Sequence, residues 1–170
     1  METNELVTAP PGDPGYLKNK DLYFLTIAEA VGIGSTHPLT PGGCIIVRDR
    51  EIIGSGRQML SNSKVEIDCV SAAIGASCKL GTPAIGAVLY STRYPFPASV
   101  MQLHLMGVKR IVIAAHDWEP LYKQEFRKAA RLARELGISI EPLYKDPDPR
   151  FTSNPHQLDA YDSPQLEDKL

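Results

Sequence analysis

The order of apolar patterns along the chain predicts an α/β fold in which helices cover both faces of a mixed, five-stranded sheet. Two β-branched runs, residues 43–48 and 52–57, are separated by only three residues, which is typical of an antiparallel hairpin. Three later apolar runs alternate with helical patterns, as in βα units with parallel strands. The chain has 170 residues, 43% apolar and 22% charged, which is ordinary for one globular domain.

Each predicted helix has its own sequence signal. Residues 21–31 are apolar on most sides, which predicts a buried helix ending near Gly32. Residues 65–80 are rich in small side chains, which let a helix lie close against a sheet. Residues 97–106 end at Gly107, and residues 122–136 repeat apolar side chains at helical spacing. The remaining predicted strands are residues 85–91, 110–115 and 138–143. The predicted order is therefore α-β-β-α-β-α-β-α-β, arranged as three α-β-α layers.

Proline and glycine content divides the chain into three parts. We predict an N-terminal arm over residues 1–18, a domain over residues 19–144 and an acidic C-terminal tail over residues 145–170. The tail cannot form one long helix, because it contains several prolines: Pro147, Pro149, Pro155 and Pro164.

Charge and cysteine content exclude several classes of protein. The formal net charge of −2 disfavours a general electrostatic binder of nucleic acids or membranes. Helix 122–136 does carry a basic stripe, which we interpret as a solvated face: Lys123, Arg127, Lys128, Arg131 and Arg134. Three cysteines without a C-x-x-C pair argue against a disulfide framework and against a cysteine zinc knuckle. With no apolar run long enough to cross a bilayer and no secretory signal pattern, we expect a cytoplasmic protein.

Three stretches of the sequence resemble the CMP/dCMP deaminase family of zinc-dependent nucleotide deaminases, which includes the tRNA adenosine deaminases. These stretches are DLYFLTIAEAV, GCIIVRDREIIGSG and AVLYSTRYPFPASVMQLHLMGVKRIVIAA. The last is similar to the family's strand, Pro-Cys-x-x-Cys turn, helix and following strand. The resemblance extends over residues 21–143 and implies a cytidine-deaminase-like fold.

The resemblance also implies where the family's chemistry would lie. The family holds Zn²⁺ with a His and two Cys, from an H-x-E and a P-C-x-x-C motif, and the Glu moves protons. In the register of VEIDC, Glu66 takes the His position and Asp68 the Glu position. In YPFPAS, Pro95 is retained, but Phe96 and Ser99 take the two Cys positions.

All three zinc ligands are therefore replaced, and we expect no zinc cofactor and no hydrolytic deamination. A catalytic zinc needs three protein ligands, which Phe96 and Ser99 cannot supply as the two cysteines do. A rebuilt site of Glu66, Asp68 and Cys69 is the alternative that we rank last.

Each altered residue also has a structural interpretation. Ser63 and Glu66 match the S-x-x-E capping box of a helix start, which we favour over a ligand role for Glu66. Phe96 would fill the volume that the metal leaves, or would serve as a stacking platform for a base. Asp68 would favour the helix dipole or face a bound base. Gln58 stands where many family members have an Asn that contacts the sugar, so it is a candidate ligand contact.

These observations favour a deaminase-fold pseudoenzyme that binds a nucleotide or nucleoside, or a catalytic deaminase-like partner subunit. The alternative is an enzyme of altered chemistry that uses Glu66 and Asp68 as a carboxylate pair. We also expect a homo-oligomer, because the short helix 97–106 carries more apolar surface than its own sheet can bury: Met101, Leu103, Leu105 and Met106. Loop residues His37, His116 and Trp118 are further candidates for ligand contacts, and none belongs to a motif.

Overall fold

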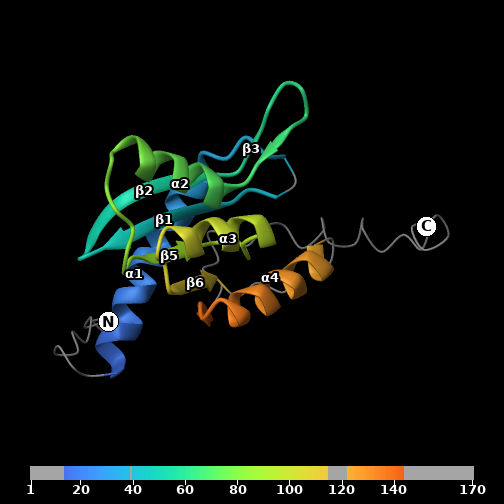
Figure 1. Cartoon of the computed structure of the whole chain (residues 1–170). Coiled ribbons are helices and arrows are strands. Elements are labelled where there is room, and N and C mark those ends of the chain that lie inside the picture. Colours follow the sequence, from blue (N-terminus) through green and yellow to red (C-terminus); the bar gives the residue numbers. More distant parts are fainter. Residues whose placement is uncertain (1–13, 39, 115–121, 144–170) are drawn as a thin grey trace, which may run out of the picture.

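A computed structural model describes residues 14–38, 40–114 and 122–143, which form four helices and a five-stranded sheet (Figure 1). The helices are α1 (Pro14–Ile33), α2 (Cys69–Lys79), α3 (Pro97–Leu105) and α4 (Lys123–Glu135). The strands of the sheet are β1 (Gly43–Arg48), β2 (Glu51–Arg57), β5 (Val88–Ser91), β6 (Arg110–Ala114) and β7 (Ser139–Leu143). A separate two-stranded ribbon pairs β3 (Met59–Leu60) with β4 (Glu66–Ile67).

The strand order β2-β1-β5-β6-β7 confirms the predicted mixed sheet. Strand β1 is antiparallel to both β2 and β5, whereas β5, β6 and β7 run parallel to one another. As their sequence patterns predict, the hairpin at residues 43–57 forms the antiparallel part of the sheet, and the later βα units form its parallel part.

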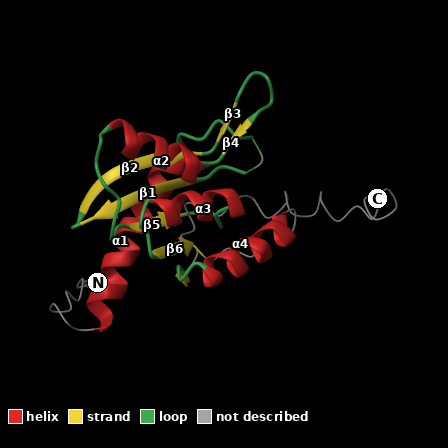
Figure 2. Cartoon of the chain, in the orientation of Figure 1, coloured by secondary structure: helices red, strands yellow, loops and turns green. Residues whose placement is uncertain are grey.

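Helices cover both faces of the sheet and bury two separate cores (Figure 2). Successive side chains of β1 alternate between the faces, as in any strand. Cys44 and Ile46 belong to the larger core, with α2, α3 and α4. Ile45 and Val47 belong to the smaller core, with Phe24 of α1. The chain thus has the three α-β-α layers expected from its sequence.

Helix α1 is fixed to the sheet by a backbone contact and by a partly buried ionic network. A Cβ atom on Gly43 would lie 2.2 Å from the Gly32 nitrogen, so only glycine lets β1 approach the end of α1 this closely. In the first half of the helix, the Asp21 carboxylate accepts hydrogen bonds from Tyr90 Oη (2.7 Å) and from both terminal nitrogens of Arg110 (3.0 and 2.6 Å). Arg110 also bonds Glu141 Oε2, so one guanidinium joins α1, β6 and β7.

Several predicted boundaries differ from the structure. Helix α1 begins at Pro14, inside the predicted arm of residues 1–18, since proline is tolerated in the first turn of a helix. Strand β5 begins at Val88 instead of residue 85, because Gly86 has a φ of +76° and turns the chain just before the strand. The predicted tail at residues 145–170 lies outside the described residues. None of the helices that the structure describes is long and apolar enough to cross a membrane.

The start of α2 is the main correction. The predicted helix from residue 65, with a capping box of Ser63 and Glu66, is wrong, because α2 begins at Cys69 with Asp68 as its N-cap. Lys64 has a φ of +60°, which breaks a helix, and the next residues pair with β3 as strand β4. Glu66 therefore lies before the helix, on the ribbon.

Candidate functional site

The starts of α2 and α3 meet at Asp68 and Ser99. Asp68 is the N-cap of α2, and Ser99 lies in the first turn of α3, where Pro97 begins the helix. Ser99 Oγ donates a hydrogen bond to Asp68 Oδ2, although the two residues are 31 positions apart in the sequence. Of the four positions that the family resemblance points to, these two are thereby brought into direct contact.

Both oxygens of the Asp68 carboxylate are engaged by the protein itself. Oδ1 accepts from the Val70 N–H (3.1 Å), and Oδ2 lies 3.4 Å from the Ser71 nitrogen and 3.3 Å from Ser71 Oγ. Together with Ser99 Oγ, these contacts place four polar groups around one carboxylate. Asp68 is therefore satisfied by neutral donors, as a helix cap and as an acceptor across the two helix starts.

Phe96 packs in an aromatic cluster with side chains of α4 and its N-cap. Its ring centroid is 5.4 Å from that of Tyr122, nearly edge to face, and 5.9 Å from that of Phe126. Tyr94 joins the cluster through Phe126, with centroids 5.3 Å apart, and contacts the larger core. Burial raises the pKa of Tyr94 above its ordinary value, as expected for a packing side chain. An apolar cluster thus surrounds the residue that the sequence resemblance assigns to the position of a metal-binding thiolate.

Glu66 and Gln58 form a second, separate polar group. Gln58 is 1% exposed, its Oε1 accepts from the Cys69 N–H (3.0 Å) and its Nε2 donates to Glu66 Oε1. His37 Nε2 lies 3.8 Å from the same carboxylate, while His37 Nδ1 accepts from the Thr40 N–H (3.0 Å). Gln58 therefore holds the ribbon to the start of α2, and both ends of its amide have partners within the protein.

The described residues contain no group of three His, Cys, Asp or Glu side chains that could hold a metal ion. Glu66, Asp68 and Cys69, the set considered for a rebuilt site, do not form such a group. Cys69 is fully buried, and its Sγ lies 4.0 Å from Ser91 Oγ. Burial raises the pKa of the neighbouring Cys44 thiol well above its ordinary value, and Cys44 Sγ donates to the Cys69 carbonyl (3.0 Å). The donor set present does not fit a catalytic zinc ion, which requires three such ligands around one point.

The structure places further polar side chains at the candidate site that the sequence patterns did not reveal. Ser71 Oγ lies 3.3 Å from Gln102 Oε1, which extends the polar group of Asp68 along the line where α2 meets α3. Arg93 is buried, donates from Nη1 to the Thr40 carbonyl (3.0 Å) and lies over the Tyr122 ring, 5.4 Å from its centroid. None of these residues belongs to a spacing pattern, although Arg93, a charged residue two positions after a buried strand, could have been singled out. His116 and Trp118 lie outside the described residues.

Solved structures of other proteins match this fold, whereas comparisons of sequence alone find no match. No protein-family profile matches the chain, and no characterised protein matches its sequence significantly. Among solved structures, the dCMP deaminase of cyanophage S-TIM5 matches with a TM-score of 0.61 and 16% identity, over 73% of this chain and 97% of that one. RibD of Acinetobacter baumannii matches with a TM-score of 0.58 and 26% identity, over 74% of this chain and 35% of that one.

A Thermotoga maritima protein, a diaminohydroxyphosphoribosylaminopyrimidine deaminase joined to a reductase, matches with a TM-score of 0.62 and 21% identity. That alignment covers 74% of this chain and 37% of the other. The class of protein that these matches define is an α/β domain of the cytidine-deaminase-like fold. The 26% identity to RibD supports a cytidine-deaminase-like superfamily for this chain, in agreement with the resemblance found in its sequence at that coarser level.

Proposed function

We propose that this chain is a deaminase-fold pseudoenzyme, which acts by binding a ligand and not by zinc-dependent deamination. The observation that carries the proposal is the Asp68–Ser99 hydrogen bond between the starts of α2 and α3. Here a carboxylate accepts from a hydroxyl and from the N–H groups of its own helix, and we assign this pair to the place where the family brings metal ligands together. Without the metal, the pKa of a water molecule stays far above neutrality, so the water is a poor nucleophile at neutral pH.

The contact with Ser99 also suggests a change of register in the first motif. Two residues that share a metal in the family must be neighbours, and the neighbour of Ser99 is Asp68, not Glu66. On this assignment Asp68 takes the His position, and the H-x-E spacing places the proton-shuttle position at Val70. Val70 is 1% exposed and apolar, so it cannot move protons. The change of register strengthens the case against deamination.

A nucleotide is the first ligand that we propose for this site. The matched cyanophage protein has been solved in complex with dCMP and dUMP. Of the three predicted ligand contacts, Asp68 and Phe96 are partly exposed, whereas Gln58 is buried with both amide ends engaged. We therefore assign the ligand contacts to Asp68 and Phe96 and a supporting role to Gln58.

The test combines metal content, catalysis and binding on one preparation of the full chain. We expect far less than one zinc per chain by mass spectrometry, no deamination of cytidine or adenosine nucleotides, and binding of dCMP by calorimetry. Asp68→Ala should weaken that binding about tenfold, whereas Glu66→Gln should leave it unchanged. Stoichiometric zinc would contradict the proposal and favour a rebuilt metal site.

Two other outcomes identify the remaining candidates. Turnover of a nucleotide that is lost in both Glu66→Gln and Asp68→Asn would favour the carboxylate-pair enzyme. The structure gives these two carboxylates different partners, Gln58 for one and Ser99 for the other, which argues against that mechanism. An absence of nucleotide binding, with capture of a deaminase-like protein, would assign the site to a partner subunit.

We further propose that two copies of the chain associate through α3. The four apolar residues expected to form this surface divide into two pairs. Leu103 is fully buried and Met106 packs on the larger core, so neither is available to a partner. Met101 and Leu105 remain 41% and 78% exposed, and Ile85, close to Gly107 at the end of the helix, is 75% exposed. These three side chains form the surface that a second copy would cover.

A further inference from the structure

Helix α4 carries more cations than its own acidic residues can neutralise. Its 13 residues include five basic and two acidic ones, which gives a formal charge of +3. Glu125 and Glu135 are each paired with a basic neighbour on the same helix. The other three basic side chains are exposed and form no ion pair with any residue that the structure describes: Lys123, Arg127 and Arg134.

These three cations lie on one face of the helix, and we call them the α4 stripe. At about 100° per residue, the directions of their side chains differ by at most about 40°. Phe126 and Ala133 are buried on a different side of the helix. The first and last cation of the stripe lie about 17 Å apart along the axis. A solvated helix face usually alternates both signs of charge, whereas the α4 stripe is uniformly positive.

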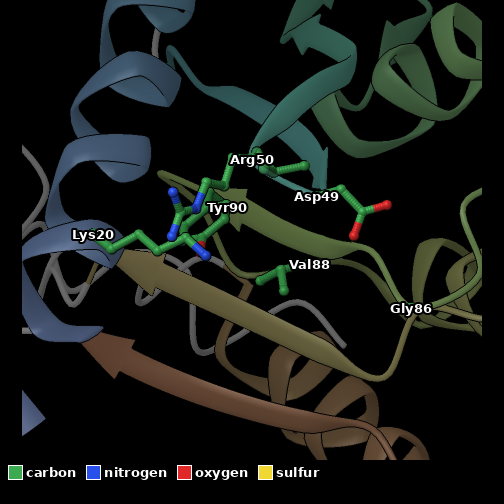
Figure 3. Close-up of a pocket in the computed structure, with 7 residues that line it drawn as sticks. Lys20, Asp49, Arg50, Gly86, Val88 and Tyr90 are labelled. Atoms are coloured by element: carbon green, nitrogen blue, oxygen red, sulfur yellow. The ribbon is translucent and has the colours of Figure 1, made fainter. Parts of the chain in front are cut away.

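Cations also gather at a cavity beside α1, but there they have acidic neighbours (Figure 3). Lys20 and Arg50 line this cavity together with Asp49. Asp21 interacts electrostatically with Lys20, and Arg50 has an interaction of its own within the chain. Acidic groups thus offset the charge of this cavity, whereas no described residue outside α4 forms an ion pair with the α4 stripe.

A strongly acidic stretch of the chain lies beyond the described residues, at 159–168. Its sequence, DAYDSPQLED, holds four acidic residues and no basic one. Its formal charge of −4 is opposite in sign to the charge of α4 and similar in size. An extended chain separates Asp159 from Asp162 by about 10 Å, which matches the rise of about 10 Å between Arg127 and Arg134. Charge and spacing therefore make this segment complementary to the α4 stripe.

The place where the described chain ends brings this segment within reach of α4. Helix α4 connects the parallel strands β6 and β7, so it runs back along the sheet, and its first turn lies near the carboxyl end of β7. The described chain ends there, at Leu143. Residues 144–158 can bridge up to about 50 Å when extended, well beyond the length of α4, which is about 20 Å.

We propose that residues 159–168 bind along the α4 stripe of their own chain. Each exposed ion pair is weak alone, but several pairs form together here because both partners belong to one chain. A contact of this kind is screened by salt. It neutralises the cationic face of α4 and competes with any other polyanion for that face. The inference goes beyond the proposed function, because it uses none of the residues around Asp68.

The test attaches a nitroxide spin label to this segment in the full chain and measures the backbone amide signals by NMR. Ser163→Cys carries the label in a Cys78→Ser background, because Cys44 and Cys69 are buried and Cys78 is exposed. We expect the label to broaden the amide signals of α4 about threefold more than those of α1, and about 1 M NaCl to abolish this difference.

Charge variants of the labelled protein test whether the contact is ionic. Arg127→Glu combined with Arg134→Glu should abolish the excess broadening of α4. Lys64→Glu is the matched control, since it makes the same change of charge at an exposed lysine of the ribbon, and it should leave the broadening unchanged. Adding Asp159→Lys and Asp162→Lys to the α4 double variant should restore the broadening, because the charges are then exchanged between the two partners.

Three results would overturn the proposal. The first is equal broadening of α4 and α1 in the labelled protein with the native stripe. The second is broadening of α4 that persists at high salt or in the α4 double variant, because the contact would then not be ionic. The third is equally strong broadening in a mixture of spin-labelled chains and isotope-enriched chains without the label, which would assign the acidic segment to a second copy.

Discussion

Asp21 and Arg110 form the most consequential ion pair among the described residues. Burial alone would raise the pKa of the Asp21 carboxyl, but hydrogen bonds from Arg110 and Tyr90 outweigh it and hold that pKa below its ordinary value. Hydrogen bonds from Arg110 likewise lower the pKa of Glu141, although burial opposes them. A carboxyl group with a depressed pKa stabilises the folded state above its unfolded pKa, near 4, and this stabilisation is lost as the pH falls.

Arg110→Gln should therefore lower the free energy of unfolding at pH 7 by about 2–3 kcal/mol, because it leaves Asp21 buried without its cation. The figure is below that of a fully buried pair, since the Arg110 side chain is 33% exposed. The difference between variant and wild type should shrink below about pH 4, where Asp21 and Glu141 take up protons. Urea unfolding at several pH values measures both effects.

The exposed pair of Lys128 and Glu125 supplies the control for this experiment. Its side chains are 65% and 43% exposed, so Lys128→Gln should change stability by about 0.5 kcal/mol or less. A loss in Arg110→Gln that stays constant from pH 7 to pH 3 would mean that the packing of the arginine, and not the ionic network, accounts for it.

A second test at the residue scale asks whether Asp68 or Glu66 is the better position for a zinc ligand. Asp68→His combined with Phe96→Cys and Ser99→Cys should create a zinc site, because Asp68 already touches Ser99. The matched triple variant with Glu66→His in place of Asp68→His should bind zinc far more weakly, since Glu66 is held by Gln58 on the ribbon. Metal titration with a colorimetric zinc competitor compares the two. Tighter binding by the Glu66→His triple would restore the register first predicted for VEIDC.

At the scale of elements, α2 lies unusually close to β2. A Cβ atom on Gly56 would lie 2.1 Å from the Cys69 carbonyl oxygen and 2.3 Å from the Ala73 nitrogen. Gly56→Ala should therefore push helix and strand apart and destabilise the fold by about 3 kcal/mol or more, since backbone atoms cannot move aside cheaply. Thermal unfolding followed by circular dichroism measures the loss.

Gly75 of the same helix is the counterpart of Gly56. Nothing lies within 4 Å of a Cβ atom placed there, and its φ is not in the left-handed region. Gly75→Ala should stabilise the helix by about 0.5–1 kcal/mol, because alanine loses less backbone freedom on folding. If both substitutions proved equally harmful, the cost would come from the helix itself and not from its contact with β2.

Most elements could be predicted from the sequence, because their apolar periods and glycine stops act locally. Gly107 and Gly137 end their helices with positive φ, and β1, β6 and α4 lie within a residue of their predicted bounds. The start of α2 could not, since Ser63 and Glu66 match a capping box, while Asp68, five residues after Ser63, is also a favoured N-cap residue. Which of the two caps forms depends on the contacts of Asp68 with Ser99, which bring together residues from distant parts of the chain.

The sequence predicted which residues of the candidate site are altered, but not how their side chains are arranged in space. The prediction that Phe96 and Ser99 replace metal ligands rests on their place after Pro95, which the sequence alone displays. The side chains that contact these residues could not be predicted, because a sequence without the family's motif does not specify what surrounds each position. Tyr122 against Phe96 and Ser71 against Asp68 are contacts between elements, visible only once the helices are packed.

At the scale of the whole molecule, the exposed apolar end of α3 leads to a prediction about assembly. We expect the wild-type chain to sediment as a dimer or larger species at micromolar concentration. Leu105→Glu should shift it toward the monomer without unfolding it, because this side chain is 78% exposed. Leu143→Glu is not a suitable control, because Leu143 of β7 packs against the smaller core on the sheet face that α1 covers. Tyr23→Glu, at a 62% exposed position on α1, serves instead and should leave the mass unchanged.

The contact between Gly32 and Gly43 has a consequence for how such a chain can diverge. A zinc ligand can be exchanged for another residue once selection for catalysis ends, since a phenyl ring or a hydroxyl then fills the space. No side chain of any kind fits at Gly43, where a Cβ would lie 2.2 Å from one backbone atom and 2.3 Å from another. Chains that share this fold should therefore retain Gly43 even where the residues of a reaction have changed, which makes this glycine a marker for recognising distant relatives.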